Sequence, residues 1–442
     1  MIRLRLLIVL ALLFPAFSAH ADEVMRFSDA YERALSYDAK LQIAEAVFDA
    51  NREEIGKARA GFRPNLRISA ALGRNATEST SLVNDVTQEY FYNTRNYSVV
   101  LKQPIFSMAT FEQYGQSKAV AAKSEALLQK ERDALAVRTL EAYVNVLFAE
   151  DNLAYSRARV TAAKEQFQQA KRRFSAGFGT ITEINEAQAH YDISLAEGLE
   201  HNNTLENSRR EFEAVIGIYP DRIAKLDPAM LVLLLPEPHD VEEWVRYGLE
   251  NNAELDAARQ EIRIAEKQVG KNRAARYPVL DLLASRTFSE SDNNYSIGTQ
   301  YDTYSLNLQL SMPIYSGGYA SASVRQASAQ LREATEQASQ YQRTLSSRIR
   351  KFYNGILGNI AQIRAYEQAV KSNEIALTGT KKGYESGFRS NVDVLNAQEK
   401  LYDSLRNLAR SRYQYIINRI MLKNEAGLLT RDDIDEISGW LK

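Results

Sequence analysis

The sequence predicts a mainly α-helical protein with a small membrane-type β part, built as two similar halves. The first observation is a repeat: the run Gly-Phe-Gly-Thr-Ile-Thr-Glu that begins at Gly177 returns about 210 residues later as Gly-Phe-Arg-Ser-Asn-Val-Asp, from Gly387. The second is a pair of regions in which apolar and polar residues alternate. The third is a set of helical stretches longer than a globular domain uses. A repeat of this length is a whole structural unit, so the fold should be pseudo-symmetric.

The composition excludes several classes of protein. The 442 residues carry a net charge of −1, which gives no bulk attraction to nucleic acid. The absence of cysteine excludes disulfides, thiolate metal sites and lipid attachment to an N-terminal cysteine. The chain is therefore expected to carry no lipid anchor.

The amino terminus predicts export. Arg3 and Arg5 precede an apolar run at 6–14, and Ala19 and Ala21 supply the small residues of a cleavage site. Residues 1–21 are interpreted as a secretory signal peptide, with an uncleaved anchor as the alternative. No later stretch has about 18 apolar residues, so no transmembrane helix is expected in the mature chain.

Each half begins with a predicted helix, over 27–60 in the first half and 241–275 in the second. Apolar residues recur there with helical spacing, and each helix stops before a proline, Pro64 or Pro278.

A β-hairpin follows each of these helices, at about 65–103 and 279–312. In the second hairpin, Leu306, Leu308 and Leu310 alternate with polar residues, whereas Arg286 interrupts the apolar side of its partner strand. Polar stretches at 75–95 and 289–302 are expected to separate the strands. Strands of about ten residues with one apolar face suit a transmembrane β-barrel. A soluble sheet with one buried face is the alternative.

Four strands cannot close a membrane barrel, because about eight is the smallest number known and an open edge leaves backbone groups unpaired in hydrocarbon. Several chains must therefore share one barrel. Two copies would give eight strands and a filled interior, whereas three would give twelve strands and a lumen. Three copies are preferred for a conduit.

Long helix pairs complete each half. Residues 116–176 contain neither glycine nor proline, and such a helix would be about 90 Å long. In the last helix, apolar residues recur every seven positions, as in a coiled coil. The predicted ranges are 116–176 with 181–216, and 318–384 with 392–426. The halves therefore span 22–216 and 241–427, joined by a linker at 217–240 and followed by a tail at 428–442 that is expected to be a short helix packed outside.

These features, with the tip segments 174–184 and 384–398, resemble the TolC-like outer-membrane efflux and secretion channels over essentially the whole mature chain. The resemblance implies a homotrimer with a twelve-stranded barrel in outer-membrane lipid and a coiled-coil tunnel across the periplasm of a Gram-negative cell. It also implies a periplasmic adaptor (membrane fusion) protein and an inner-membrane pump of ABC, RND or MFS type as partners. Substrates would pass through unchanged, so no enzyme activity, cofactor or metal site is expected.

The resemblance also implies a gate at the helix tips. By motif position, Tyr384 and Arg389 match residues that bond across to the first-half turn, here Thr182 and Glu183. Asp393 matches an acid that forms a ring in the constriction. The family often has a second acid one turn later, where this chain has Asn396, so the ring would carry about three charges rather than six.

Two glycine–phenylalanine pairs mark the turns between the long helices: Gly177 with Phe178, and Gly387 with Phe388. They can simply end the helices, with glycine at C′ and the aromatic ring packed back. The resemblance adds adaptor contact. Another function remains open, a soluble periplasmic coiled-coil adaptor or scaffold, and the sequence does not identify the transported substrate.

Overall fold

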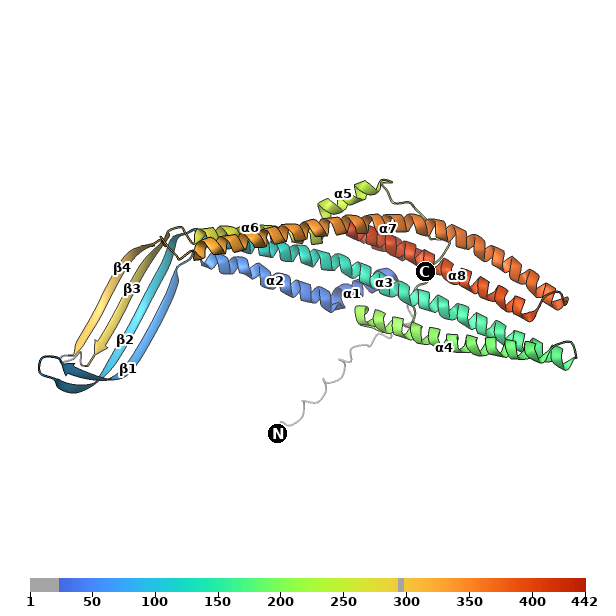
Figure 1. The fold of residues 1–442 in the computed structure, drawn as a ribbon, viewed down its shortest axis with the longest axis horizontal. Helices are drawn as coiled ribbons and strands as arrows, with labels where there is room; N and C mark the ends of the chain where they lie inside the picture. The colour runs from blue at the N-terminus through green and yellow to red at the C-terminus, as the bar shows by residue number, and fades with distance from the viewer. Residues whose placement is uncertain (1–23, 293–297) are drawn as a thin grey trace, which may run out of the picture.

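Two long helical hairpins set the shape of the molecule. The computed structural model describes residues 24–292 and 298–442, so the predicted signal peptide lies outside the described residues. The hairpins are formed by α3 (Met108–Ser175) with α4 (Ile181–Ile216), and α7 (Tyr319–Glu385) with α8 (Asn391–Glu425). With 68 residues, α3 is about 100 Å long. A β-sheet lies at one end of the molecule, and the two hairpin tips lie at the other (Figure 1).

The helix that opens each half is interrupted, which the sequence did not predict. The range 27–60 forms α1 (Phe27–Tyr37) and α2 (Ala39–Ala60), and the second half repeats this as α5 (Val241–Asn251) and α6 (Ala253–Ala274). At the breaks, Asp38 and Asn252 are extended and cap the following helix, accepting hydrogen bonds from Leu41 N at 2.8 Å and Leu255 N at 3.0 Å. Since no glycine or proline marks the break, periodicity alone could not find it.

The sheet has four antiparallel strands in the order β1-β2-β3-β4. They are β1 (Asn65–Ser81), β2 (Val86–Ser107), β3 (Val279–Ser291) and β4 (Thr299–Ser311). The two hairpins of the repeat therefore pair with each other through β2 and β3. β1 and β4 are edge strands, and each pairs with one strand only in the described part of the chain.

The polar stretch 75–95, expected to separate two strands, is largely strand itself, whereas the middle of the other stretch, 293–297, lies outside the described residues. β1 and β2 are 17 and 22 residues long, and they continue through most of 75–95. Cross-strand hydrogen bonds between polar side chains support the ladder here, between Thr80 and Thr87 at 2.8 Å and between Thr77 and Tyr92 at 3.3 Å. The prediction was wrong because it assigned the polar residues of 75–95 to a loop. Threonine and tyrosine, which are frequent in this stretch, favour strands.

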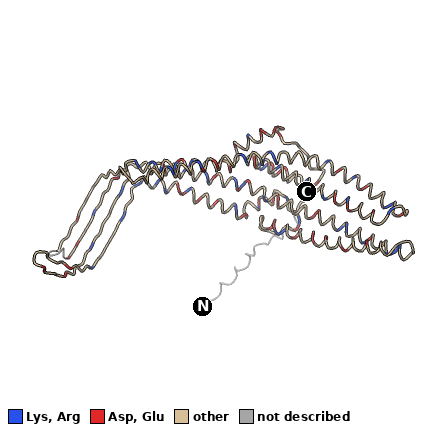
Figure 2. Tube along the Cα trace, in the orientation of Figure 1, with Lys and Arg blue, Asp and Glu red and all other residues tan. Residues whose placement is uncertain are grey.

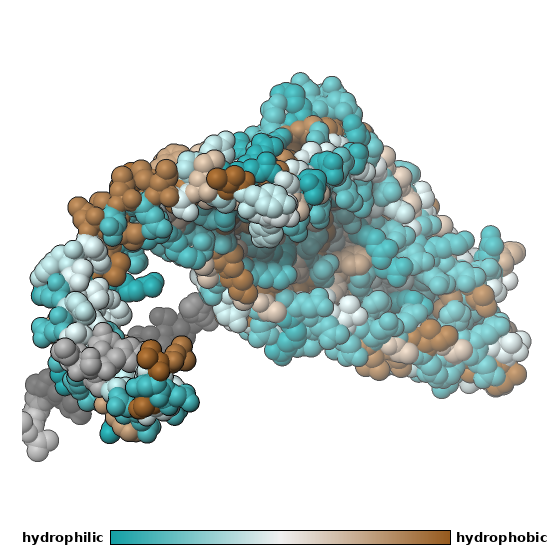
Figure 3. All heavy atoms as spheres, turned by 60° about the vertical axis from the view of Figure 1, so that its left-hand side comes forward, coloured by the Kyte–Doolittle hydropathy of each residue, from teal (hydrophilic) through white to brown (hydrophobic). Residues whose placement is uncertain are grey.

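One face of the sheet is apolar, and its side chains are exposed in the single chain. This apolar face is formed by Leu66, Ile68, Leu72, Val99, Leu101, Leu306, Leu308 and Leu310. Figure 3 shows apolar residues gathered where the sheet meets the helices, while much of the helical body is hydrophilic. Arg286 also lies on this face, where it pairs with both carboxylate oxygens of Asp302 at 3.0 and 3.1 Å and lies over the ring of Tyr304. Its charge is thus neutralised locally.

The main core lies midway along the helices. Tyr143 is fully buried there and meets Phe27 and Phe212 edge to face, with ring centroids 5.9 and 5.6 Å apart. Its hydroxyl donates to the carbonyls of Met25 and Ala224, at 3.0 and 2.8 Å. These contacts tie the start of the described chain and the linker to α3.

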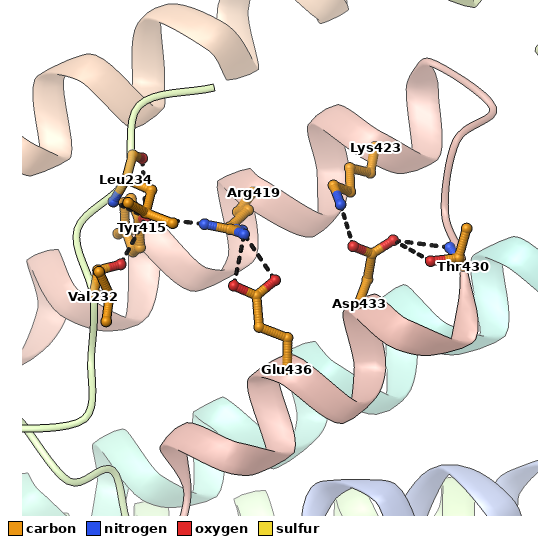
Figure 4. Close-up of polar contacts among 8 residues, drawn as sticks. All are labelled: Val232, Leu234, Tyr415, Arg419, Lys423, Thr430, Asp433 and Glu436. Carbon is orange, nitrogen blue, oxygen red and sulfur yellow. Dashed lines mark hydrogen bonds and ion pairs between the residues drawn. The ribbon is translucent and has the colours of Figure 1, made fainter. Parts of the chain in front are cut away.

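The linker and the tail are part of this core. The 428–442 segment forms α9 (Arg431–Trp440), and its Ile434, Ile437 and Trp440 are buried in the core rather than packed outside. Figure 4 shows the polar contacts: Arg419 of α8 binds Glu436 at 2.7 and 2.8 Å, and Lys423 pairs with Asp433.

The linker is held by the same side of α8, one turn before Arg419, whose guanidinium contacts the Tyr415 hydroxyl at 3.4 Å. The buried hydroxyl of Tyr415 accepts a hydrogen bond from Leu234 N at 2.9 Å and lies 3.1 Å from Leu234 O (Figure 4).

Charges of both signs alternate along the helices (Figure 2), and many pair between helices. Examples are Lys123–Glu261 at 2.8 Å and Arg209–Glu150 at 2.9 Å. Within residues 24–292 and 298–442, no helix is both long and apolar enough to span a bilayer.

Candidate functional site at the helix tips

The two hairpin tips share one turn geometry. Gly177 and Gly387 occupy the left-handed region, with φ of 81° and 80°. In each turn the next residue donates to the carbonyl five positions earlier, Phe178 N to Arg173 O and Phe388 N to Gly383 O, both at 2.9 Å. This is the Schellman arrangement, in which glycine avoids the steric cost of a Cβ at positive φ. The prediction that both glycines end their helices is therefore confirmed.

The phenylalanines of these turns do not pack back on their helices. The exposed fractions of Phe178 and Phe388 are 79% and 88%. Each tip thus presents a large apolar ring to solvent, which is unusual for a turn whose only task is to end a helix. Adaptor contact through Gly177, Phe178, Gly387 and Phe388 stays a prediction.

A capping box opens the return helix of each hairpin. In α4, Thr180 Oγ1 accepts from Glu183 N at 3.2 Å, and Glu183 accepts from Thr180 N at 3.3 Å. In α8, Ser390 and Asp393 make the same exchange at 3.1 and 2.9 Å. Glu183 and Asp393 therefore occupy equivalent positions of the repeat. The sequence analysis missed this capping role, although the spacing of Thr180 and Ser390 to the acids was a visible signal.

The acid predicted for the constriction is held in its charged form. Hydrogen bonds from the backbone and hydroxyl of Ser390 lower the pKa of Asp393 below its usual value, and nearby Arg389 adds to this. Asn396 is exposed one turn later, on the same side of α8. The side chains of both residues can therefore line one surface, with one charge per chain.

Tyr384 lies between the two hairpins. It is 3% exposed, and the guanidinium carbon of Arg173 is 4.8 Å from the centroid of its ring. Burial raises the pKa of its hydroxyl, Arg173 opposes that rise and Glu183 adds to it. The buried hydroxyl has no hydrogen-bond partner among the described residues. Sequence reasoning missed Arg173, because its partner is more than 200 residues away.

The predicted gate residues are only partly brought together within one chain. Thr182 and Arg389 are exposed, and Tyr384 is near Glu183. No hydrogen bond or ion pair joins Arg389 to Thr182 or Glu183 in the described part of this single chain.

The comparisons with known proteins agree with this architecture. The chain matches the outer membrane efflux protein family in two stretches, 30–217 and 244–428, one in each half. The alkaline protease secretion protein AprF of Pseudomonas aeruginosa is 31% identical over 414 residues, which cover 93% of this chain and 86% of AprF. The outer membrane protein TolC of Escherichia coli is 31% identical over 416 residues, 91% of this chain and 82% of TolC.

The fold also matches that of a solved outer-membrane protein. The outer membrane protein VceC of Vibrio cholerae aligns with a TM-score of 0.77 at 20% identity, covering 91% of this chain and 96% of VceC. The family match over most of the chain, together with this shared fold, establishes that the chain belongs to the outer membrane efflux protein family.

Proposed function

We propose that three copies of this chain form an outer-membrane exit duct that passively conducts substrates from an inner-membrane pump. The sheet carries this proposal: its apolar face is exposed, and β1 and β4 have no second partner strand among residues 24–292 and 298–442. Unpaired edges are not tolerated in hydrocarbon, so β4 of one copy must pair with β1 of the next. Three copies give twelve strands, enough to enclose a lumen. The long helices would continue this lumen into the periplasm.

An adaptor and a pump would complete the assembly at the helix tips. The exposed rings of Phe178 and Phe388 offer six apolar contacts around a trimer, three of each kind, with two from each chain. AprF is named for secretion of an alkaline protease, so an ABC-type pump for polypeptides is the first partner to look for. Co-purification of the crosslinked complex, followed by mass spectrometry, would identify the pump and hence the substrate class.

Cell fractionation separates the duct from a soluble adaptor or scaffold. The duct should be found in the outer membrane as a trimer whose gel mobility changes on heating. Recovery as a monomer in the soluble periplasmic fraction would contradict the proposal. A soluble monomer rarely exposes a contiguous apolar patch such as the leucine face of this sheet. The same preparation would reveal whether residues 1–21 are removed.

We propose that Arg389 locks the gate by pairing with Glu183 and Thr182 of a neighbouring copy. Arg389→Ala should therefore raise the single-channel conductance in planar bilayers. An exposed ion pair contributes about 0–1 kcal/mol, but three pairs that break together can bias the closed state by up to about 3 kcal/mol.

Arg406→Ala is the matched control, since Arg406 is exposed on the same helix away from the tip. A conductance of Arg389→Ala equal to that of Arg406→Ala would count against the lock.

Asp393 is proposed to form the acidic ring of the constriction. Asp393→Asn should weaken block of the channel by multivalent cations, because the ring loses all of its roughly three charges. Asn396→Asp should strengthen the block, because it adds a second ring one turn away. Concentration–block curves in bilayers measure both effects, and identical curves for the three proteins would place Asp393 outside the pore lining.

A further inference from the structure

One face of the sheet is polar, and its charges do not balance. Side chains alternate along a strand, so this polar face is the one opposite the apolar face of Leu66 and Leu308. Of the strand residues that the structure describes, three charged ones lie on it: Arg67 of β1, Lys102 of β2 and Asp281 of β3. Two cations therefore share one acid, and each chain keeps one positive charge in excess.

Lys102 takes the acid, which leaves Arg67 as the excess cation. The ammonium of Lys102 lies 2.8 Å from a carboxylate oxygen of Asp281. Arg67 is exposed and faces Val100 across the ladder. Among residues 24–292 and 298–442, no acid forms an ion pair with Arg67. An exchange of partners between Arg67 and Lys102 would leave the excess charge on the same face.

We propose that Arg67 forms a ring of three cations in the lumen of the barrel, and that this ring binds the carboxylates of acidic peptide segments. The ring rests on the proposed function, because the polar face lines a lumen only when three copies close the barrel. It deepens that function by giving the duct a charge-selective site in the sheet, at the end of the molecule away from the hairpin tips (Figure 1).

A neighbouring copy has no charge with which to neutralise the ring. β1 is an edge strand in the described chain, so Arg67 would meet β4 of the next copy. Asp302, the one acid of β4, lies on the apolar face and binds Arg286 there. This holds for every register that keeps the two polar faces together. The polar face of β4 is uncharged and consists of Thr299, Tyr301, Thr303, Ser305, Asn307, Gln309 and Ser311.

Serine hydroxyls near Arg67 add neutral donors for an anion. Ser69 lies two positions after Arg67 on the same face, and its hydroxyl is 2.7 Å from that of Ser98. In such a pair one hydroxyl donates to the other, so the second keeps its hydrogen for another acceptor. Ser285 and Ser305 form a similar pair at 2.6 Å on β3 and β4. A charged donor and neutral donors therefore share this face, and both favour an anion over a cation.

The carboxylates of a peptide suit this ring better than small anions do. A small monovalent anion would meet one exposed cation, and such a contact contributes little by itself. An acidic peptide segment carries several carboxylates on one chain, so they can contact separate arginines at the same time. The ring also has the opposite sign to the proposed ring of Asp393 at the hairpin tips, so the two ends of the duct would attract different charges.

Block of single channels by a hexaglutamate peptide tests the ring. The peptide is added to the assembled full-length protein on the side of the bilayer where the barrel opens, away from Asp393. Arg67→Gln should weaken the block by up to about fivefold for each arginine that the peptide contacts, the size expected for exposed ion pairs. Added salt should weaken the block of the wild type, since it screens exposed charges. Arg74→Gln is the matched control, because Arg74 is exposed on the same strand but lies on the opposite face.

Asp281→Asn should change the block in the other direction. It leaves Lys102 without its acid, so each chain would carry two excess charges and the block should strengthen. Arg67→Lys should keep the block, because it keeps the charge. Heat-modifiable trimer bands of wild-type intensity would establish that each variant assembles.

Two results would overturn the ring. One is equal block, or no block, of the wild type, Arg67→Gln and Asp281→Asn. The other is a loss of block in Arg74→Gln as large as in Arg67→Gln, which would place the peptide outside the lumen. Failure of the duct proposal is distinguishable, because the wild-type protein would then form no channels at all.

Discussion

Leu308→Arg is expected to abolish assembly in the outer membrane. Leu308 is 66% exposed on the apolar face, between Leu306 and Leu310 on the edge strand β4. An arginine on the lipid side of a barrel strand costs about 2–4 kcal/mol near the bilayer midplane. Three copies would multiply that cost to about 6–12 kcal/mol, as much as the whole stability of an ordinary domain. The yield of heat-modifiable trimer in the membrane fraction measures the effect.

The adjacent residue is the matched control. Asn307 points to the opposite face, because side chains alternate along a strand, and that face carries hydroxyl pairs such as Ser285 with Ser305 at 2.6 Å. Asn307→Arg should therefore assemble like the wild type. A normal yield of Leu308→Arg trimer would mean that the apolar face does not meet lipid.

Trp440→Ala is expected to destabilise the helical body by about 3–5 kcal/mol, the usual cost of removing a buried large aromatic side chain. Trp440 is 5% exposed, lies in the main core, and has the guanidinium carbon of Arg419 5.4 Å from its ring. Its carbonyl also accepts from Asp227 N at 3.0 Å, so loss of the indole would loosen α9 and the linker together. Thermal unfolding followed by circular dichroism measures the loss.

Gly439→Ala controls for substitution within the same helix. A Cβ at residue 439 would meet no atom within 4 Å, and alanine favours helix, so stability should be unchanged or rise by about 0.5–1 kcal/mol. Equal midpoints for Trp440→Ala and wild type would show that α9 adds nothing to the core.

Most of the architecture could be predicted from the sequence, because long helices and strands show a regular spacing of apolar residues. The absence of glycine and proline over 116–176 predicted a helix, and α3 extends it at the start to Met108. Alternation over 304–312 predicted a strand with one apolar face, which β4 provides. The repeat predicted that the same elements would occur twice, and the long helices agree closely in length, with 68 residues in α3 and 67 in α7.

The errors have local causes. The breaks at Asp38 and Asn252 were missed, because a capping side chain can interrupt a helix without disturbing its apolar spacing. The strand lengths were underestimated, because polar residues in a membrane hairpin continue the ladder beyond the apolar band. The tail was expected outside, yet Ile434, Ile437 and Trp440 place α9 in the core. A helix of about ten residues has too few apolar positions for their spacing to predict which part of the protein it packs against.

The sequence by itself determined the repeat, the type of each long element and the family, since these depend on patterns of neighbouring residues along the chain. Only the tertiary structure decided which side chains meet at the tips. Arg173 and Tyr384 are 211 positions apart, and their contact depends on how two helices of about 100 Å lie beside each other. A small change in the angle between such helices moves their ends by many ångströms, and no local pattern encodes that angle. The repeat therefore fixed the two hairpins, while their packing selected the residues that join them.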